Sequence, residues 1–497
     1  MQPVDGSYLH SVLKSVFGKS AFRSCQEDII RAALEGYDLL VLLPTGHGKS
    51  LTYQLPAVAT KSPFGVTIVV SPLIALMKSQ LDGLLGNEKI HAAALHGQLS
   101  TADRQRVLMD LTSSAPQTRL LYVSPELCAT PAFRKMLTKM AVRGAVARFV
   151  IDEAHCCVEW GLDFRPSYKE LRYMREEFPS VPITALTATA SETVQRGIVE
   201  MLGLDTPRLK KFTTSVNRPN LHYEVKYFTT HNYERDIIPN LVKFLTEYKA
   251  RRESVEASLQ NQEGSTDAAA LAWLRRRKSS GAGIIYCRKK STVELVAQAL
   301  QSAGFGANAY HAGLSQEHRD NVLSEWLANT PGFEVVVATV AFGMGIDKED
   351  VRFVIHADLP GSVESYYQAS GRAGRDGKGA RCILYYSRED RDRVLALNRG
   401  KGVGGGDEEE VVRKRYSNTQ EEPSSIAVGL RWLVQYCENT NSCRHLYLCG
   451  YFEKEVPQTP SAEWCHYACD YCKDARAVSN RSKVLAEESM DYYQFYY

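Results

Sequence analysis

The sequence predicts an α/β protein with two lobes, each built on a parallel sheet, followed by a small helical module rich in cysteine. Short apolar segments alternate with amphipathic segments over the first two hundred residues, and the alternation restarts near residue 283. Strands that alternate with helices form parallel sheets with helices on both faces. At 497 residues the chain also exceeds one ordinary core, which favours two to four domains.

Five strand candidates in the first lobe each end at a cluster of small, polar or charged residues. Ligands bind at the carboxyl ends of strands in parallel sheets, so these clusters are the first places to search for a site. Helical patterns such as LIALMKSQLDGLLG, from Leu73, lie between the candidates. The candidates are DLLVLL from Asp38, VTIVV from Val66, RLLYV from Arg119, RFVID from Arg148 and PITAL from Pro182.

A second set of strand candidates follows a polar segment. Residues 250–281 are weakly patterned and are expected to form a surface insertion or mobile loop, with RRRK at 275–278 as a solvated charge run. The glycine-rich segment at 400–410 is expected to be flexible. The second set is GIIYC from Gly283, EVVVAT from Glu334, RFVIH from Arg352 and RCILYY from Arg381.

These patterns divide the chain into four expected parts. Residues 1–207 form the first lobe, 208–397 the second lobe, 398–475 the cysteine-rich helical module and 476–497 a tail.

Composition restricts the class of protein only broadly. Hydrophobic residues make up 44% and charged residues 24%, as in soluble globular proteins. The formal charge of +3 is mildly basic, so any surface that binds phosphates must be a local patch. The start lacks a charged segment followed by an apolar one, and no window approaches 18 apolar residues. We therefore expect an intracellular protein with no membrane partner.

The segment PTGHGKS, residues 44–50, follows a strand and precedes a helical pattern, which is the context of a phosphate-binding loop. Glycines let backbone amides close around phosphate oxygens, and the helix amino terminus adds partial positive charge. A lysine in this position reaches the β- and γ-phosphates, and the hydroxyl after it ligates Mg²⁺. The candidate nucleotide ligands are Thr45, Gly46, Gly48, Lys49 and Ser50, with Ser50 also a magnesium ligand.

The tetrapeptide DEAH closes the strand candidate RFVID about a hundred residues later. Asp152 at the strand end is expected to hold Mg²⁺, directly or through water, and Glu153 to orient and deprotonate the attacking water. His155 is expected to sense the nucleotide and report to the other lobe. The alternative, an acidic strand end of no function, does not explain the phosphate loop upstream.

The second lobe supplies arginines in QASGRAGRDG, residues 368–377. Arg372 and Arg375 are three apart and share one face if this stretch is helical. Cationic donors directed at the γ-phosphate stabilise charge in the transition state. Two arginines on a helix are more often simply solvated, but the flanking glycines favour the functional interpretation.

The cysteine-rich module predicts a metal site. Six of the 12 cysteines lie between Cys437 and Cys472, a density that inside cells indicates zinc more often than disulfides. Four thiolates suit a closed tetrahedral Zn²⁺ site. His445 and His466 are alternative ligands, and Cys437 and Cys449 are spare. The candidate ligands are Cys443, Cys465, Cys469 and Cys472.

The combination of motifs resembles the RecQ family of DNA helicases from about Leu13 to Cys472. The first lobe carries the phosphate loop, SPLIALMKSQ, DEAH followed by WGLDFRPSY, and ALTATA. The second carries IIYCRKK, YHAGL, ATVAFGMGIDKEDVRFVIH and YYQASGRAGRDG. The resemblance implies two RecA-like lobes and a helical zinc-binding subdomain. The chain resembles the branch of the family in which that subdomain ends the helicase core, since only 25 residues follow Cys472.

The resemblance also assigns sites that the motifs alone do not. In FGKSAFRSCQ, Gln26 is similar to a residue that reads the adenine edge, with Arg23 beside it, and Gln368 matches another nucleotide-contacting position. Trp160, Phe164 and Arg165 follow DEAH in a segment similar to the family's DNA-sensing loop. Further residues, SPLIALMKSQ and YVSPE, would lie along the DNA backbone.

Two departures from the family pattern matter. In the first, Glu159 and Leu162 stand where most relatives have glutamine and histidine, and in the second, Ala369 stands where most have glutamate. The first removes a hydrogen-bonding group from the DNA-sensing loop. The second is expected to be milder, because both arginines remain.

The function implied by the resemblance is an ATP- and Mg²⁺-dependent helicase that moves 3′ to 5′ on single-stranded DNA and unwinds duplex or forked DNA. Repair, recombination and replication are the expected settings, in the nucleus if the chain is eukaryotic and otherwise in the cytoplasm, and a monomer is expected. Two alternatives stay open. One is an RNA-directed or non-unwinding translocase, since the motor motifs do not read the 2′-hydroxyl. The other is a DNA-binding scaffold with residual ATPase activity.

Overall fold

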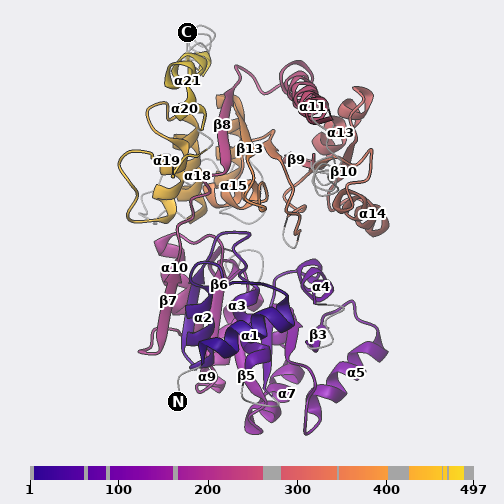
Figure 1. Cartoon of the computed structure of the whole chain (residues 1–497), viewed down its shortest axis with the longest axis vertical. Helices are drawn as coiled ribbons and strands as arrows, with labels where there is room; N and C mark the ends of the chain where they lie inside the picture. Colours follow the sequence, from indigo (N-terminus) through magenta and orange to yellow (C-terminus); the bar gives the residue numbers. More distant parts are fainter. Residues whose placement is uncertain are drawn as a thin grey trace. The chain divides into compact units, whose positions relative to one another are not determined.

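The computed structural model divides into two compact units (Figure 1). The first unit runs to Val216 and regains residues 344–347 and 452–454, and the rest of the chain forms the second unit. No helix in the part described is long and apolar enough to cross a membrane. The structure describes residues 5–60, 65–84, 90–159, 166–260, 281–343, 346–400, 425–461, 463–466 and 469–485.

The first unit contains a sheet whose described pairings are all parallel. Its strand order is β3-β4-β2-β5-β6-β1-β7, so β6 lies between β5 and β1. The carboxyl ends of β1, β5 and β6 therefore meet at one edge of the sheet. The strands are β1 (Asp38–Leu42), β2 (Val66–Val70), β3 (Ala92–Leu95), β4 (Leu120–Val123), β5 (Val146–Ile151), β6 (Ile183–Thr187) and β7 (Leu209–Thr213).

Apolar cores cover both faces of this sheet. Alternate residues of β1 enter different cores, Leu40 on one face and Leu39 on the other, as the two-residue period of a strand requires. Helices α7 and α10 pack on the first face, and α2, α3 and α4 on the second. The helices are α1 (Gly6–Phe17), α2 (Gln26–Leu34), α3 (Leu51–Ala59), α4 (Ile74–Asp82), α5 (Thr101–Thr112), α6 (Pro125–Cys128), α7 (Pro131–Val142), α8 (Cys156–Glu159), η1 (Pro166–Arg172), α9 (Tyr173–Glu177) and α10 (Glu192–Leu202).

The second unit repeats the architecture with a sheet of order β10-β11-β9-β12-β13-β8. Its described pairings are also parallel, which confirms two α/β lobes. The strands are β8 (Leu221–Tyr227), β9 (Gly283–Tyr286), β10 (Ala307–Tyr310), β11 (Val335–Ala338), β12 (Phe353–His356) and β13 (Ala380–Tyr386). The helical elements are η2 (Tyr233–Ile237), α11 (Ile238–Gln260), α13 (Lys290–Ser302), α14 (Gln316–Leu327), α15 (Val363–Ser370) and α16 (Arg388–Gly400).

The cysteine-rich module belongs to the second unit and packs on its edge strand β8. Asp470 accepts a hydrogen bond from the Val225 amide at 3.1 Å, and His445 contacts the Leu221 carbonyl at 3.0 Å. The module thus occupies backbone groups that an edge strand otherwise leaves open. Its helices are α18 (Ser425–Glu438), α19 (Arg444–Phe452), α20 (Asp470–Lys473) and α21 (Ala475–Ser482).

The structure differs from the sequence expectations in three places. The expected loop at 250–281 was wrong in its first part, because α11 continues to Gln260; the RRRK run lies outside the described residues. Strand β7 lies beyond residue 207 and pairs with β1, so the first unit extends to Val216. Strands β3, β7, β8 and β10 had not been expected. Alanine in β3 and β10 has low strand propensity, and β7 and β8 lie at sheet edges and carry polar residues.

Candidate functional site

The phosphate loop, residues 44–50, connects β1 to α3 at the carboxyl edge of the first sheet. Gly46 and Gly48 adopt φ values of 85° and 74°, which residues with a side chain rarely adopt. Ser50 is the N-cap residue of α3, so the loop leads into the amino terminus of that helix. The loop therefore has the backbone geometry and the helix end that favour a bound phosphate.

Arg23 and Gln26 hold the loop from outside. The Gln26 amide nitrogen donates to the carbonyls of His47 at 3.1 Å and Gly48 at 3.0 Å, and its oxygen accepts from the Arg23 amide at 2.8 Å. The Arg23 guanidinium donates to the Gly46 carbonyl at 2.9 Å. A methyl group at Gly48 would lie 2.4 Å from the Gln26 amide nitrogen, so glycine is required for this approach. That Gln26 reads adenine stays a prediction.

DEAH begins directly after β5, and Asp152 is buried at the same edge of the sheet. Burial and then the neighbouring Glu153 charge raise the pKa of Asp152 to about 7, against the opposing influence of Lys49. The backbone of Glu153 takes the left-handed conformation, with φ of 50°, which is uncommon outside glycine. A buried carboxylate that is costly to ionise is a group that a divalent cation would stabilise. Asp152 and Ser50 are therefore suited to Mg²⁺, which prefers oxygen ligands.

His155 connects DEAH to the segment that follows β6. Its Nδ1 lies 2.9 Å from the Thr187 hydroxyl and 3.4 Å from Glu153 Oε2. The Thr187 hydroxyl in turn donates to the Thr189 carbonyl at 3.0 Å. Burial lowers the pKa of His155, partly opposed by Glu153, so the ring is neutral at neutral pH. His155 thus connects DEAH by hydrogen bonds to ALTATA and lies within ion-pair distance of Glu153, a connection that sequence reasoning had not identified.

The DNA-sensing segment is only partly described. Trp160, Phe164 and Arg165 lie outside the described residues, as do Gly161 and Leu162. Tyr168, which follows them in η1, is fully buried in the first core. Tyr168 is therefore a core residue.

The second unit presents Arg372 and Arg375 on a turn, residues 371–377, named here the arginine turn. Helix α15 ends at Ser370, so the condition under which both arginines would share one helical face is not met. Glycine favours the left-handed conformation, and Gly374 and Gly377 adopt it with φ of 57° and 77°. These glycines shape the turn that follows the helix. Gln368, half-buried, lies in the last turn of α15.

Arg218 supports the arginine turn and was missed by sequence reasoning. Its buried guanidinium donates to the carbonyls of Gly371 at 3.3 Å, Ala373 at 3.1 Å and Gly374 at 2.8 Å. Asn220 also donates to the Gly374 carbonyl at 2.9 Å. The Arg372 side chain itself is buried and donates to the Gly343 carbonyl. The segment NRPN that carries both supporting residues has no metal, phosphate or catalytic signature, so no sequence signal identified them.

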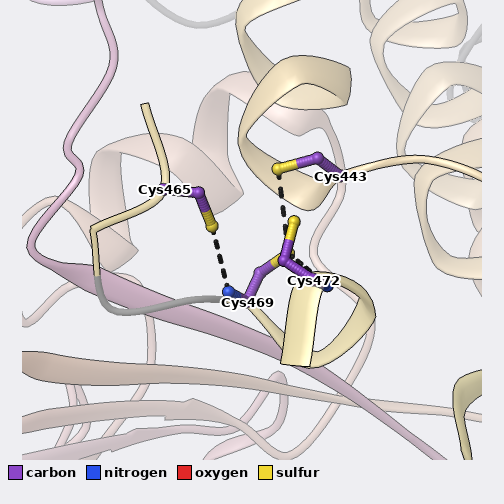
Figure 2. A group of neighbouring side chains, drawn as sticks. All are labelled: Cys443, Cys465, Cys469 and Cys472. Carbon is purple, nitrogen blue, oxygen red and sulfur yellow. Dashed lines mark hydrogen bonds between the residues drawn. The ribbon is translucent and has the colours of Figure 1, made fainter. Parts of the chain in front are cut away.

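The four predicted cysteines come together in the module (Figure 2). Their sulfur atoms all lie within 4.8 Å of one another, and Cys443 Sγ and Cys469 Sγ are 3.8 Å apart. Sulfurs at the corners of a tetrahedron with Zn–S bonds of about 2.3 Å are about 3.8 Å apart, so the cluster fits Zn²⁺. Backbone amides of Arg444 and Cys472 donate to Cys469 Sγ at 3.4 and 3.5 Å, which favours a thiolate there.

The alternative ligands do not join this cluster. His445 is buried, with Nδ1 2.9 Å from Asn217 Oδ1 and Nε2 3.0 Å from the Leu221 carbonyl, so both ring nitrogens are in use. His466 is exposed and lies outside the four-cysteine group. The sulfur-only set is therefore the one that the structure assembles.

A second group of potential metal ligands, His231, Asp358 and Asp390, lies at the carboxyl edge of the second sheet. Arg288 already forms ion pairs with both aspartates there. Burial lowers the pKa of His231, but its hydrogen bond to Asp358 and the charges of Asp390 and Asp358 outweigh burial and raise it overall. The group is therefore a charge-balanced network, and Arg288 occupies the place of a cation.

Family models match three successive segments of the chain. The model described as DEAD/DEAH box helicase matches residues 23–197, helicase conserved C-terminal domain matches 267–377, and RecQ zinc-binding matches 407–473.

Similar curated proteins cover nearly the whole chain. ATP-dependent DNA helicase Q5 of Mus musculus is 38% identical over 97% of this chain and 44% of its own length. RecQ-like DNA helicase BLM of Xenopus laevis is 39% identical over 94% of this chain and 30% of its own length. A Q1-type relative of Caenorhabditis briggsae is 37% identical, and the match covers 68% of it. The chain thus spans less than half of the first two relatives.

Solved structures support the fold. The Mycobacterium smegmatis helicase Lhr, solved with single-stranded DNA and AMP-PNP, matches 79% of this chain and 50% of its own with a TM-score of 0.56 at 19% identity. The DUF1998 helicase MrfA, bound to DNA, matches 82% of this chain and 55% of its own with a TM-score of 0.60 at 16% identity. At these identities the likeness concerns the fold alone. The three family matches and the relatives together identify the chain as a member of the RecQ helicase family.

Proposed function

We propose that this chain is an ATP-dependent DNA helicase that moves 3′ to 5′ on single-stranded DNA and unwinds duplex DNA. One observation carries the proposal: the phosphate loop and DEAH end strands β1 and β5 on either side of β6. His155 and Thr187 then link DEAH to the segment after β6. A motor requires a hydrolysis site that is connected by hydrogen bonds to the rest of the protein. The names of the relatives, which are DNA helicases, favour DNA as the substrate.

The proposed roles at the nucleotide follow from residue chemistry. Lys49 and the amides of Thr45, Gly46 and Gly48 bind the phosphates. Bound Mg²⁺, held by Ser50 and Asp152, would neutralise phosphate charge. Glu153 orients the attacking water and accepts its proton. Arg23 and Gln26 hold the loop, and Gln26 also contacts the base.

The second lobe contributes Gln368, Arg372 and Arg375 to the same reaction. The two arginines are proposed to stabilise negative charge on the γ-phosphate in the transition state. Arg372 Nε has no hydrogen-bond partner in the described part of the chain, so this guanidinium has unused donor capacity. That capacity supports a ligand role for Arg372.

The proposed DNA-coupling residues are His155, Trp160, Phe164 and Arg165. Aromatic rings stack on unpaired bases, and an arginine pairs with a phosphate. Single-stranded and forked DNA are the proposed substrates of a monomeric enzyme. Repair, recombination or replication in the nucleus is the proposed setting, because the relatives named above come from eukaryotes.

Zinc is proposed as a structural ion on Cys443, Cys465, Cys469 and Cys472. Four sulfur ligands leave no open coordination position for chemistry. The module packs on β8, so the metal supports the second lobe.

Strand separation on matched substrates tests the proposed function. Duplexes with a 3′ tail, a 5′ tail, a fork or blunt ends are incubated with ATP and Mg²⁺, and single-stranded DNA and RNA are compared as stimulators of hydrolysis. We expect unwinding of the 3′-tailed and forked substrates and stimulation by DNA. Lys49→Ala is the matched control that removes hydrolysis. Preferential stimulation by RNA, or hydrolysis without unwinding of any substrate, would contradict the proposal.

A further inference from the structure

Glu364 is a buried carboxylate in the first turn of α15, the helix that leads into the arginine turn. Its Oε1 accepts a hydrogen bond from the Tyr451 hydroxyl. Its Oε2 has no hydrogen-bond partner among the described residues. A buried carboxylate with only one oxygen hydrogen-bonded lowers the stability of the fold, so its presence here calls for a reason other than stability.

Gly429 of α18 faces the same carboxylate. A methyl group built at Gly429 would lie 2.5 Å from Glu364 Oε2, closer than a Cβ atom approaches an oxygen. Glycine is unfavourable inside a helix relative to alanine. The close approach of Glu364 accounts for a glycine at this position, and it fixes the distance between α15 and α18.

Tyr451 connects this carboxylate to the zinc cluster. It lies on α19, which begins at Arg444, the residue after the zinc ligand Cys443. Its ring packs 5.5 Å from that of Trp432 on α18. A second contact joins α15 to α18, since the hydroxyls of Tyr366 and Tyr436 are 3.4 Å apart. Figure 1 shows α15 next to α18 in the second unit.

The other end of α15 leads directly to the proposed reaction. The helix ends at Ser370, Gly371 caps it, and Arg372 follows. The amides of Arg372 and Ala373 donate to the carbonyls of Ala369 at 3.2 Å and Ser370 at 3.0 Å. A displacement of α15 therefore moves the arginine turn, and small displacements of charged groups lower reaction rates strongly.

We infer that Glu364 is a positioning residue for ATP hydrolysis, which Tyr451 of the zinc module holds so that α15 presents the arginine turn correctly. The inference rests on the proposed function, because it assigns the arginines to the reaction. Glu364 itself does not touch the nucleotide. The zinc module thereby contributes to turnover as well as to folding.

Tyr451→Phe is the main test, measured as ATP hydrolysis with saturating single-stranded DNA. The variant keeps the ring against Trp432 and removes only the hydroxyl. We expect kcat to fall by about tenfold, the lower end of the scale of one hydrogen bond to a charged group, while KM for ATP and zinc content stay unchanged. Glu364→Gln, whose amide oxygen still accepts from Tyr451, should keep most of the activity, and Glu364→Ala should not.

Tyr447→Phe is the matched control. Tyr447 lies on the same helix and against the same tryptophan, at 5.4 Å, but its hydroxyl contacts the exposed Gln435 at 3.4 Å. Its kcat should equal that of the unmodified chain. Gly429→Ala, which improves helix propensity, should nevertheless lower kcat because the methyl group displaces Glu364.

Arginine variants separate the two levels of the hypothesis. Arg375→Ala should lower kcat, and adding Tyr451→Phe to the double variant Arg372→Ala/Arg375→Ala should lower it no further, because the positioned groups are already gone. If Arg375→Ala and Arg372→Ala each keep full turnover, the arginine role fails and the inference with it. If they lose turnover while Tyr451→Phe matches Tyr447→Phe, the inference alone is overturned.

Discussion

The phosphate loop and the arginine turn are both glycine-bearing turns, but the chain holds them differently. Gln26, which clamps the phosphate loop, is 21 and 22 residues from the carbonyls that it contacts. Arg218, which clamps the arginine turn, is 153 to 156 residues from its own. One loop is thus held by nearby sequence and the other by tertiary structure.

This difference determines which substitutions should disturb each of the two turns. A local clamp is intact wherever the adjacent helix folds, so its loss should change nucleotide binding and little else. A distant clamp depends on the assembled second unit, including the module that packs on β8. Substitutions far from the arginine turn in the sequence should therefore change its position. Four experiments test this contrast.

The largest effect is expected from Cys469→Ser. Cys469 Sγ accepts hydrogen bonds from two backbone amides and lies 3.8 Å from Cys443 Sγ, and structural zinc contributes folding free energy directly. Elemental analysis should show loss of the metal, with an unstable or insoluble second unit and no turnover. Cys128→Ser, a buried cysteine of the first unit, is the control and should retain zinc. A soluble and active Cys469→Ser protein without zinc would break the link between module and arginine turn.

Glu153→Gln should reduce turnover by about 10²- to 10⁴-fold, the usual contribution of a general base, while ATP still binds. The amide donates and accepts hydrogen bonds but cannot take a proton from water. Single-turnover hydrolysis and nucleotide binding, measured side by side, check this expectation. Glu176→Gln changes an exposed ion pair with Arg172 and should behave as the unmodified chain. A loss of only twofold in Glu153→Gln would assign the base elsewhere.

How far the sequence predicts each region follows from the same contrast. PTGHGKS and DEAH combine residue chemistry with a strand end, so their places at one sheet edge were predictable. The four cysteines were predictable as a set, but excluding His445 required its contacts with Asn217 and Leu221. The motif GRAGRDG identifies the two arginines but does not predict the backbone conformation that carries them, because its glycines permit both a helix and a turn. Arg218 had no local signal, since its partners are carbonyls that any residue supplies.

Arg218→Lys should lower turnover per bound ATP by about tenfold, because a single ammonium group cannot span three carbonyls and the arginine turn shifts. Affinity for ATP should stay near that of the unmodified chain, since the phosphate loop has its own clamp. Steady-state kinetics separates kcat from KM.

Arg148→Lys is the control for this change. Arg148 is also a buried arginine that donates to backbone carbonyls, those of Tyr37 at 3.0 Å and Ala33 at 2.6 Å, but it lies within β5 of the first unit. It should lose stability while its folded fraction keeps kcat. Equal kcat losses in the two variants would show that burial of an arginine, and not its place under the arginine turn, determines the effect.

The smallest effect is expected from Gln26→Ala, and its pattern separates two roles of one side chain. Loss of two neutral hydrogen bonds to the phosphate loop should weaken nucleotide binding by about five- to tenfold. If Gln26 only clamps the loop, ATP and GTP should weaken equally, because the loop binds phosphates common to both. If Gln26 also reads adenine, ATP should weaken more, and the preference for ATP over GTP should fall, since a site built to hydrogen-bond one base rejects another. Gln54→Ala is the control, because Gln54 contacts Gln80 and Tyr122 away from the loop. An unchanged KM for both nucleotides in Gln26→Ala would mean that the loop keeps its shape without this clamp, and the contrast between local and distant support would then rest on the glycine conformations of the phosphate loop alone.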